Sequence, residues 1–180
     1  MNKFNTKVSE LLSEEEYKYE YSCVMCDLTD PLLLNKMKHI VDSVPYEALA
    51  DYGREYESHI TALYGIHTNN VDVIKGKMSD TKTPFKFKFK GLSLFENEDF
   101  DVLKFDIESE DLINLNKKLR ELDYTSSYKD YKPHLTVAYV KSGMGKQLLH
   151  ETILDGVETK SSRFTISLGK TNDKVVFNNG

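Results

Sequence analysis

The chain has 180 residues, and its composition of 39% hydrophobic and 29% charged residues is that of a soluble globular protein. It holds no apolar run of about 18 residues, so we expect no transmembrane helix, and residues 1–16 lack the apolar segment of a secretory signal. The net charge of −5 argues against a protein that follows long nucleic acid, because such proteins neutralise many phosphates with lysine and arginine.

The first predicted elements are a buried strand over 21–29 and a helix over 31–44, with Asp30 as the N-cap of the helix. The strand carries both cysteines of the chain, Cys23 and Cys26. Residues three apart on a strand point to opposite faces. We therefore expect two reduced core thiols rather than a redox pair or a metal site.

Strands and helices then follow in an order that repeats in the second half of the chain, which indicates an internal duplication. The acidic turn 96–99 marks its midpoint. We expect one domain, 1–180, with lobes at about 17–97 and 98–180. The further predicted strands are 59–66, 85–90, 102–108, 134–140, 163–168 and 174–177, the last two as a hairpin, and the further predicted helices are 71–78, 111–122 and 145–153.

The most informative feature is a six-residue pattern that begins two of these strands, HITALY from His59 and HLTVAY from His134. Alternation along a strand places His59 and Thr61 on one face, and likewise His134 and Thr136, with apolar residues on the other. Two imidazoles in one site can work as base and acid, and threonine hydroxyls can bind the non-bridging oxygens of a phosphate. The pattern therefore predicts phosphodiester cleavage.

Two further expectations come from the same motifs. No carboxylates or cysteines converge on them, and threonine is a poor metal ligand, so we expect neither a metal nor a cofactor. Tyr64 and Tyr139 lie an odd number of positions from their histidines, so straight strands would turn both rings toward the core.

Tyrosine-rich loops precede both motif strands, at 51–58 and 124–133. Aromatic rings at the rim of a site can stack on nucleobases, although rings in loops also serve simply to pack the loop. The cations among them could bind phosphate or belong to the solvated surface. The candidate substrate-binding residues are Arg54, Tyr56, Tyr128, Tyr131 and Lys132.

The paired His-x-Thr motifs at His59 and His134 resemble the two signatures of the two-histidine (2H) phosphoesterase superfamily. This resemblance implies an α+β, duplicated, bilobal fold, with two pseudo-symmetric lobes whose antiparallel sheets line a central cleft and whose helices lie outside. It also implies that the two histidines are the catalytic pair, that Thr61 and Thr136 hold the phosphate, and that no metal is needed.

Members of that superfamily include RNA 2′,3′-cyclic phosphodiesterases, 2′,5′-oligoadenylate phosphodiesterases and phage nucleases that degrade the cyclic oligonucleotide signals of CBASS immunity. The acidic charge disfavours a tRNA-sized substrate, and the size and Lys/Asn-rich composition resemble a phage protein. We therefore expect a monomer or weak oligomer in the cytoplasm, that of the host if phage-encoded, which hydrolyses cyclic di- or trinucleotides to counter CBASS. The alternatives are the other two phosphodiesterase activities and a sponge that binds without turnover. The sequence leaves open which histidine is the base.

Overall fold

A computed structural model describes residues 21–126 and 128–179, so the expectation for residues 1–16 falls outside the described part of the chain. Within this part, three α-helices and two 3-10 helices accompany the strands of one sheet. The strands are β1 (Ser22–Asp27), β2 (Leu49–Arg54), β3 (His59–Ile66), β4 (Phe85–Phe95), β5 (Phe100–Glu108), β6 (His134–Lys141), β7 (Glu158–Ser161), β8 (Arg163–Ser167) and β9 (Lys174–Asn178). The helices are α2 (Pro31–Ser43), α3 (Val71–Met78), α4 (Glu110–Leu119), η2 (Tyr46–Ala48) and η3 (Gly145–Leu148).

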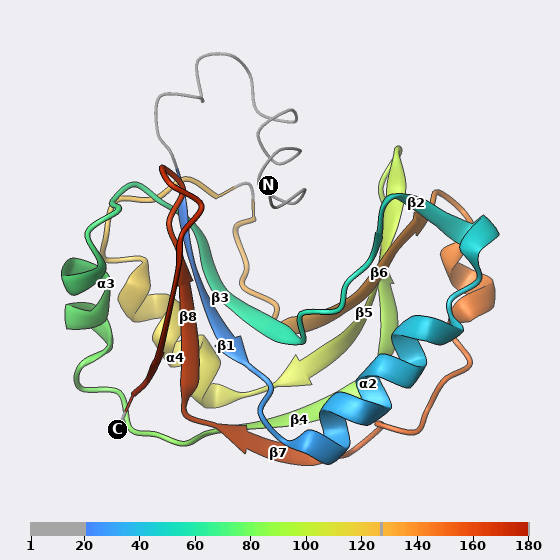
Figure 1. Cartoon of the computed structure of the whole chain (residues 1–180), viewed down its shortest axis with the longest axis horizontal. Helices are drawn as coiled ribbons and strands as arrows, with labels where there is room; N and C mark the ends of the chain where they lie inside the picture. The colour runs from blue at the N-terminus through green and yellow to red at the C-terminus, as the bar shows by residue number, and fades with distance from the viewer. Residues whose placement is uncertain (1–20, 127, 180) are drawn as a thin grey trace.

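The sheet is antiparallel, in the order β7-β4-β5-β6-β3-β1-β8-β9, and β2 pairs with β6. Figure 1 shows that it curls into a U, with β1, β3 and β8 in one arm, β5 and β6 in the other, and β3 meeting β6 near the base. The two motif strands, β3 and β6, are therefore neighbours at the middle of the sheet. The α+β class and the antiparallel pairing are as predicted.

One continuous sheet takes the place of the two separate sheets that the resemblance implied. We call β3, β1, β8 and β9 the β3 half, and β6, β5, β4, β7 and β2 the β6 half. Each half combines strands from both predicted lobes, 17–97 and 98–180, and the β4–β5 hairpin crosses the boundary between them.

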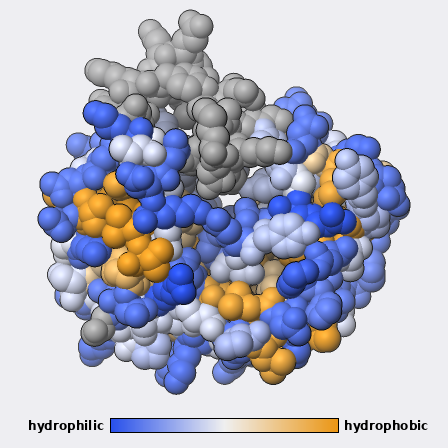
Figure 2. All heavy atoms as spheres, viewed as in Figure 1, coloured by the Kyte–Doolittle hydropathy of each residue, from blue (hydrophilic) through white to orange (hydrophobic). Residues whose placement is uncertain are grey.

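The core lies on the face of the sheet that α2 and α4 cover, and it is shared by both halves. Helix α2 begins where the Asp30 carboxylate accepts hydrogen bonds from the backbone N–H groups of Leu32 and Leu33, which confirms the predicted N-cap. Phe85 of β4 and Phe164 of β8 meet edge to face with ring centroids 5.1 Å apart, so opposite halves touch inside the core. Figure 2 shows a mainly hydrophilic surface in the same view, with separate apolar patches.

Most predicted elements are confirmed, two expectations are wrong, and one strand was missed. The predicted helix 145–153 is only the short 3-10 helix η3. Part of the predicted loop 51–58 belongs to β2, whose polar sequence contains Gly53 at φ +66° and pairs irregularly with β6. Strand β7 was not predicted, because its four residues, ETKS, are polar and occupy the edge of the sheet beside β4.

The two cysteines are free and buried, as expected. Cys23 stands opposite Tyr64 on β3, and Cys26 stands opposite Ile60, so the two thiols occupy opposite faces. Among the described residues, no helix is long and apolar enough to cross a membrane.

Candidate active site

The motif strands β3 and β6 pair at a single position, Ile60 opposite Leu135, and both of these side chains are fully buried in the core. Continuing this antiparallel register by one residue in each direction places His59 opposite Thr136 and Thr61 opposite His134. Side chains directly opposite each other have Cβ atoms about 5 Å apart. We call the surface that these four partly exposed residues share the motif face; it is the face turned away from the core.

The strands separate beyond this contact, because each finds other hydrogen-bond partners. Strand β6 turns to β2, and the backbone N–H of Glu55 donates to the carbonyl of Val137. On β3, the Tyr131 hydroxyl donates to the carbonyl of Thr61 over 2.8 Å, and the side-chain amide of Asn116 donates to the carbonyl of Ala62 over 2.7 Å. The motifs therefore meet only at their histidine ends.

Both motif strands contain a register shift directly after the threonine. On β3, Thr61 stands opposite Met25 and Tyr64 stands opposite Cys23. Met25 and Cys23 lie two apart on β1 and share a face, so Thr61 and Tyr64 share one as well. The extra residue of the bulge reverses the alternation that the sequence predicts.

The same reasoning applies to β6, where Thr136 stands opposite Lys104 and Tyr139 stands opposite Val102. The expectation that Tyr64 and Tyr139 point to the core face is therefore wrong. The Tyr64 ring is partly exposed, whereas Tyr139 is buried on the motif side, against the rings of Tyr52 and Phe100.

Each motif histidine has a carboxylate opposite it on the outer neighbouring strand. Neither carboxylate was among the predicted site residues. Asp27 of β1 stands opposite His59, and Asp106 of β5 stands opposite His134. The sequence signal was present, because alternation in 102–108 already placed Asp106 on the face opposite the core. That face is the motif face, and not merely solvated surface.

The two carboxylates have different partners. Asp27 accepts a hydrogen bond from the Thr165 hydroxyl over 2.8 Å and lies 3.4 Å from Nε of Arg163. Burial raises the pKa of Asp27 despite these contacts. Burial also acts to raise the pKa of Asp106, but hydrogen bonds from Lys104 and Ser93 outweigh it and hold that pKa below its ordinary value.

Lys104 is a buried cation on the motif face, with only 3% of its surface exposed. Its Nζ donates to Oδ1 of Asp106 over 2.5 Å and to Oγ of Ser93 over 2.7 Å, and it lies 4.0 Å from the ring centroid of Phe95. The same ring packs edge to face against His134, with centroids 4.9 Å apart. Lys104 and His134 are therefore close neighbours.

The orientation of the His134 ring is fixed by the backbone. Its Nδ1 lies 2.8 Å from the carbonyl oxygen of Lys132. A carbonyl can only accept a hydrogen bond, so Nδ1 carries the proton of the neutral ring and Nε2 keeps a free lone pair. Burial lowers the pKa of His134, which favours this neutral form.

The predicted binding residues near His134 have mixed roles. Tyr131 contributes its hydroxyl to β3 as described above, and the carbonyl of Lys132 orients His134. Tyr128 is 68% exposed, and its ring stacks on Phe95 with centroids 6.5 Å apart, beside the catalytic candidate.

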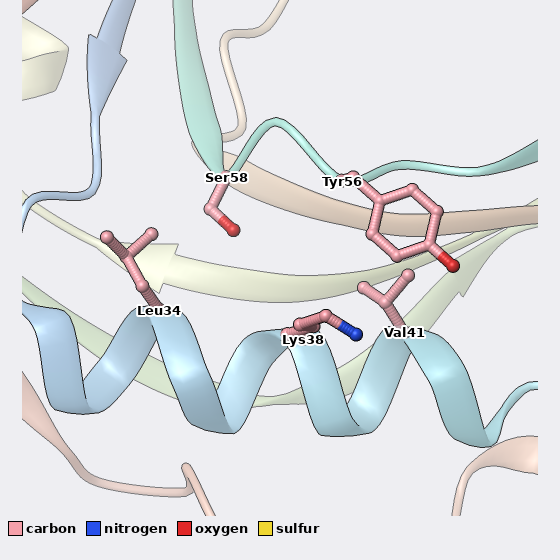
Figure 3. Close-up of a pocket in the computed structure, with 5 residues that line it drawn as sticks. All are labelled: Leu34, Lys38, Val41, Tyr56 and Ser58. Atoms are coloured by element: carbon pink, nitrogen blue, oxygen red, sulfur yellow. The ribbon is translucent and has the colours of Figure 1, made fainter.

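Two other predicted binding residues do not join the histidines. The Arg54 guanidinium donates to the backbone carbonyls of Val41 and Val44 at the end of α2. Tyr56 donates its hydroxyl to Asp42 of α2 and lines a cavity of about 320 Å³. Figure 3 shows that this cavity lies between α2 and the segment that leads into β3, and the residues lining it include none of the four motif residues.

The described residues include no group of three or more histidine, cysteine or acidic side chains that could hold a metal ion. The arrangement itself offers two imidazoles, two hydroxyls, two carboxylates and a buried lysine. Such a set can transfer protons to and from a phosphate ester and stabilise charge on its oxygens.

The chain is similar to known proteins in sequence and in fold. The sequence model of the 2′-5′ RNA ligase superfamily matches residues 50–167, a range that contains both motifs. No curated protein sequence matches the chain significantly.

Solved structures resemble almost the whole chain at low identity. The protein TT0787 of Thermus thermophilus has a TM-score of 0.61 at 17% identity, covering 89% of this chain and 95% of its own. Kluyveromyces marxianus Usb1 with uridine monophosphate has a TM-score of 0.58 at 9% identity, covering 88% and 98%. Escherichia coli LigT complexed with 3′-AMP has a TM-score of 0.57 at 13% identity, covering 87% and 93%. These similarities establish the fold.

Proposed function

The chain belongs to the 2′-5′ RNA ligase superfamily, the 2H phosphoesterases, and is a phosphodiesterase of that class; from this premise we propose that it hydrolyses the 3′-5′ bonds of small cyclic oligonucleotides. The observation that carries the proposal is the meeting of two His-x-Thr pairs where β3 and β6 touch. Each histidine there has a carboxylate opposite it on the next strand.

The chemistry follows from this arrangement. One histidine removes the proton from a ribose 2′-hydroxyl, whose oxygen attacks the adjacent 3′-linked phosphorus. The bond from phosphorus to the 5′-oxygen breaks, and the other histidine gives its proton to that oxygen. Thr61 and Thr136 donate hydrogen bonds to the non-bridging oxygens. Water can then open the resulting 2′,3′-cyclic phosphate with the two histidines in exchanged roles.

A small substrate is favoured by charge and by aromatic content. The chain carries a net charge of −5, which repels a long polyanion, whereas a single compact phosphate needs only local partners. The rings of Tyr64, Phe95 and Tyr128 lie on or beside the motif face, where nucleobases can stack. Solved structures of similar fold include LigT with 3′-AMP and Usb1 with uridine monophosphate, and each of these ligands is a single nucleotide.

Hydrolysis of such molecules would remove the cyclic-oligonucleotide signal that activates CBASS immunity. We therefore further propose that the protein is a phage enzyme that counters this immunity. The alternatives within the same chemistry are an RNA 2′,3′-cyclic phosphodiesterase and a 2′,5′-oligoadenylate phosphodiesterase; the description of the matching family names 2′-5′ RNA. A sponge that only binds nucleotides would not need two opposed imidazoles.

A panel of substrates tests this proposal. The protein is incubated with EDTA and with cyclic dinucleotides, cyclic trinucleotides, 2′,5′-oligoadenylate or RNA ending in a 2′,3′-cyclic phosphate. We expect a cyclic oligonucleotide to be cleaved fastest. His59→Ala and His134→Ala should each lower the rate by about 10²–10⁴-fold. His39→Ala, which changes an exposed histidine of α2, is the matched control and should retain activity.

The nucleophile is tested with an analogue that lacks the 2′-hydroxyl beside the scissile phosphate, which should resist cleavage. Faster turnover of the linear RNA substrates would favour the alternative activities. Tight binding with the ligand recovered whole would support the sponge. Full activity in either histidine variant, or a requirement for added metal, would overturn the two-histidine mechanism.

A further inference from the structure

The residues opposite the two histidines are of one kind, whereas those opposite the two threonines differ in charge. Asp27 and Asp106 stand opposite the histidines, but the residues opposite the threonines differ, with Met25 facing Thr61 and Lys104 facing Thr136. Among the described residues, a buried ammonium group thus accompanies the second motif only. This difference breaks the symmetry of the two histidines.

We propose that Lys104 is a positioning residue that keeps His134 neutral before reaction, so that His134 begins as the base and His59 as the acid. The assignment of roles rests on the proposed function, whereas the effect of Lys104 on His134 does not. Lys104 acts through its charge, and its ammonium group and the imidazole of His134 contact the same ring, that of Phe95.

The charged groups that act on His134 are those of Lys104, Asp106 and His59. Asp106 of β5 favours a proton on the ring, but its carboxylate is bound by Lys104 at 2.5 Å, so the two charges largely cancel. Burial is the largest cause that lowers the pKa of His134, and the charges of Lys104 and His59 lower it further. The hydrogen bond to the Lys132 carbonyl and the charge of Asp106 act in the opposite direction.

The other histidine faces a different set of charges. Met25 leaves no ammonium group beside His59 at the position that Lys104 holds in the other motif. Asp27 therefore stands opposite His59 without a lysine on its own strand, and a carboxylate there suits the histidine that gives a proton to the leaving oxygen. Arg163 approaches Asp27 from β8, but its side chain is about half exposed, which screens its charge.

With these roles, one proton is accepted and one is released in the transfer step. Nε2 of His134 accepts the proton of the 2′-hydroxyl while the oxygen–phosphorus bond forms. His59 releases its proton to the 5′-oxygen while the phosphorus–oxygen bond breaks. After this step His134 is protonated and His59 is neutral. Hydrolysis of the cyclic phosphate starts from these states, because His59 then takes a proton from water and His134 gives one to the ribose oxygen that leaves phosphorus.

The experiment is a titration of the histidine ring signals by NMR in the protein without substrate. Lys104→Met copies the residue that the first motif has at this position. We expect the pKa of His134 to rise by about one pH unit in this variant while that of His59 stays within a few tenths of its value. Lys104→Arg should keep the original value because it keeps the charge. Lys90→Met, which removes an exposed lysine of β4, should change neither histidine.

A second variant with the opposite sign protects the test against misfolding of the first. Asp106→Asn removes the carboxylate and leaves Lys104 unneutralised, so the pKa of His134 should fall. With an active substrate, the acid limb of the kcat/KM profile should move up in Lys104→Met and down in Asp106→Asn, while the basic limb stays in place.

An unchanged pKa of His134 in folded Lys104→Met, or a rise in Asp106→Asn, would overturn the proposal. A basic limb that moves with Lys104 would reverse the roles of the two histidines. If no nucleotide is cleaved and the NMR shifts are still as expected, the proposed function fails and the effect of Lys104 stands.

Discussion

The threonines of the two motifs occupy equivalent places, but their partners differ. Thr61 stands opposite the apolar Met25, whereas Thr136 stands opposite the charged Lys104. Both side chains are partly exposed on the motif face. A hydroxyl there can donate to a phosphate oxygen as negative charge develops, which stabilises the transition state more than the ground state.

We predict that Thr136→Val lowers kcat by about 10²–10³-fold, because valine keeps the shape of threonine and removes the donor. Thr136→Ser should retain most of the activity, since it keeps the hydroxyl. Steady-state kinetics on the best substrate of the panel measures both. A Thr136→Val enzyme with nearly full kcat would mean that this hydroxyl does not contact the phosphate in the transition state.

The burial of the two cysteines leads to a prediction about the reactivity of their thiols. Burial raises the pKa of Cys23 and of Cys26 to about 12, so almost no thiolate is present at neutral pH. A thiol reagent at pH 8 should therefore label neither residue until the protein is unfolded in guanidinium, when two thiols per chain should react. Rapid labelling of one cysteine in the native protein would show that it is accessible and leave room for a chemical role.

At the scale of elements, the strands with strong alternation and the helices with clear caps could be predicted from sequence. The start of β3 at His59 and the N-cap of α2 at Asp30 are examples. What local sequence could not reveal are features set by partners. Strand β7 is polar and exists because β4 offers it an edge, and the bulges after Thr61 and Thr136 appear only in the pairing with β1 and β5.

The site shows the same division. The four motif residues were predicted as the site from their repeated pattern, which brings two imidazoles and two hydroxyls, and their catalytic roles stay a prediction. Asp27 and Lys104 could not be assigned, since their importance comes from the register that places them opposite His59 and Thr136. Arg54 had the right charge for phosphate, but the end of α2 uses its guanidinium.

The hydrogen bonds that β3 receives where it separates from β6 lead to a prediction about the stability of the protein. Tyr131→Phe removes the donor to the Thr61 carbonyl and should lower the free energy of unfolding by about 1–3 kcal/mol. Asn116→Leu, which leaves the Ala62 carbonyl without its side-chain donor, should do the same. Urea unfolding measures both losses. The control is Tyr46→Phe, whose ring is 82% exposed and which should change stability by less than about 0.5 kcal/mol.

If Tyr131→Phe were as stable as the control, the hydroxyl would be free to serve a substrate instead. Its predicted role in binding would then regain support. A loss of stability with unchanged KM would assign the residue to the frame that separates the two strands.

At the scale of the whole molecule, the curled sheet joins its two halves in two ways. Hydrogen bonds connect β3 to β6 at one residue pair only, which alone would be a weak link. The core supplies the rest, because Ile60 and Leu135 are both fully buried at this junction and Phe85 meets Phe164 across it. We therefore expect the halves to unfold together, even though they are built from different strands.

Leu135→Ala tests this expectation, because the residue lies where the halves meet. The loss of buried volume should cost about 2–5 kcal/mol and lower the midpoint of one single transition. In calorimetry the van't Hoff and calorimetric enthalpies should stay equal, and slowly exchanging amides of Ile166 in β8 and Phe105 in β5 should lose protection alike. Ile153→Ala, at a side chain that is 54% exposed, should leave the midpoint nearly unchanged. Two transitions, with only one moved by Leu135→Ala, would show that each half has a core of its own, and the contact that brings His59 to His134 would then be a joint that opens below the unfolding temperature.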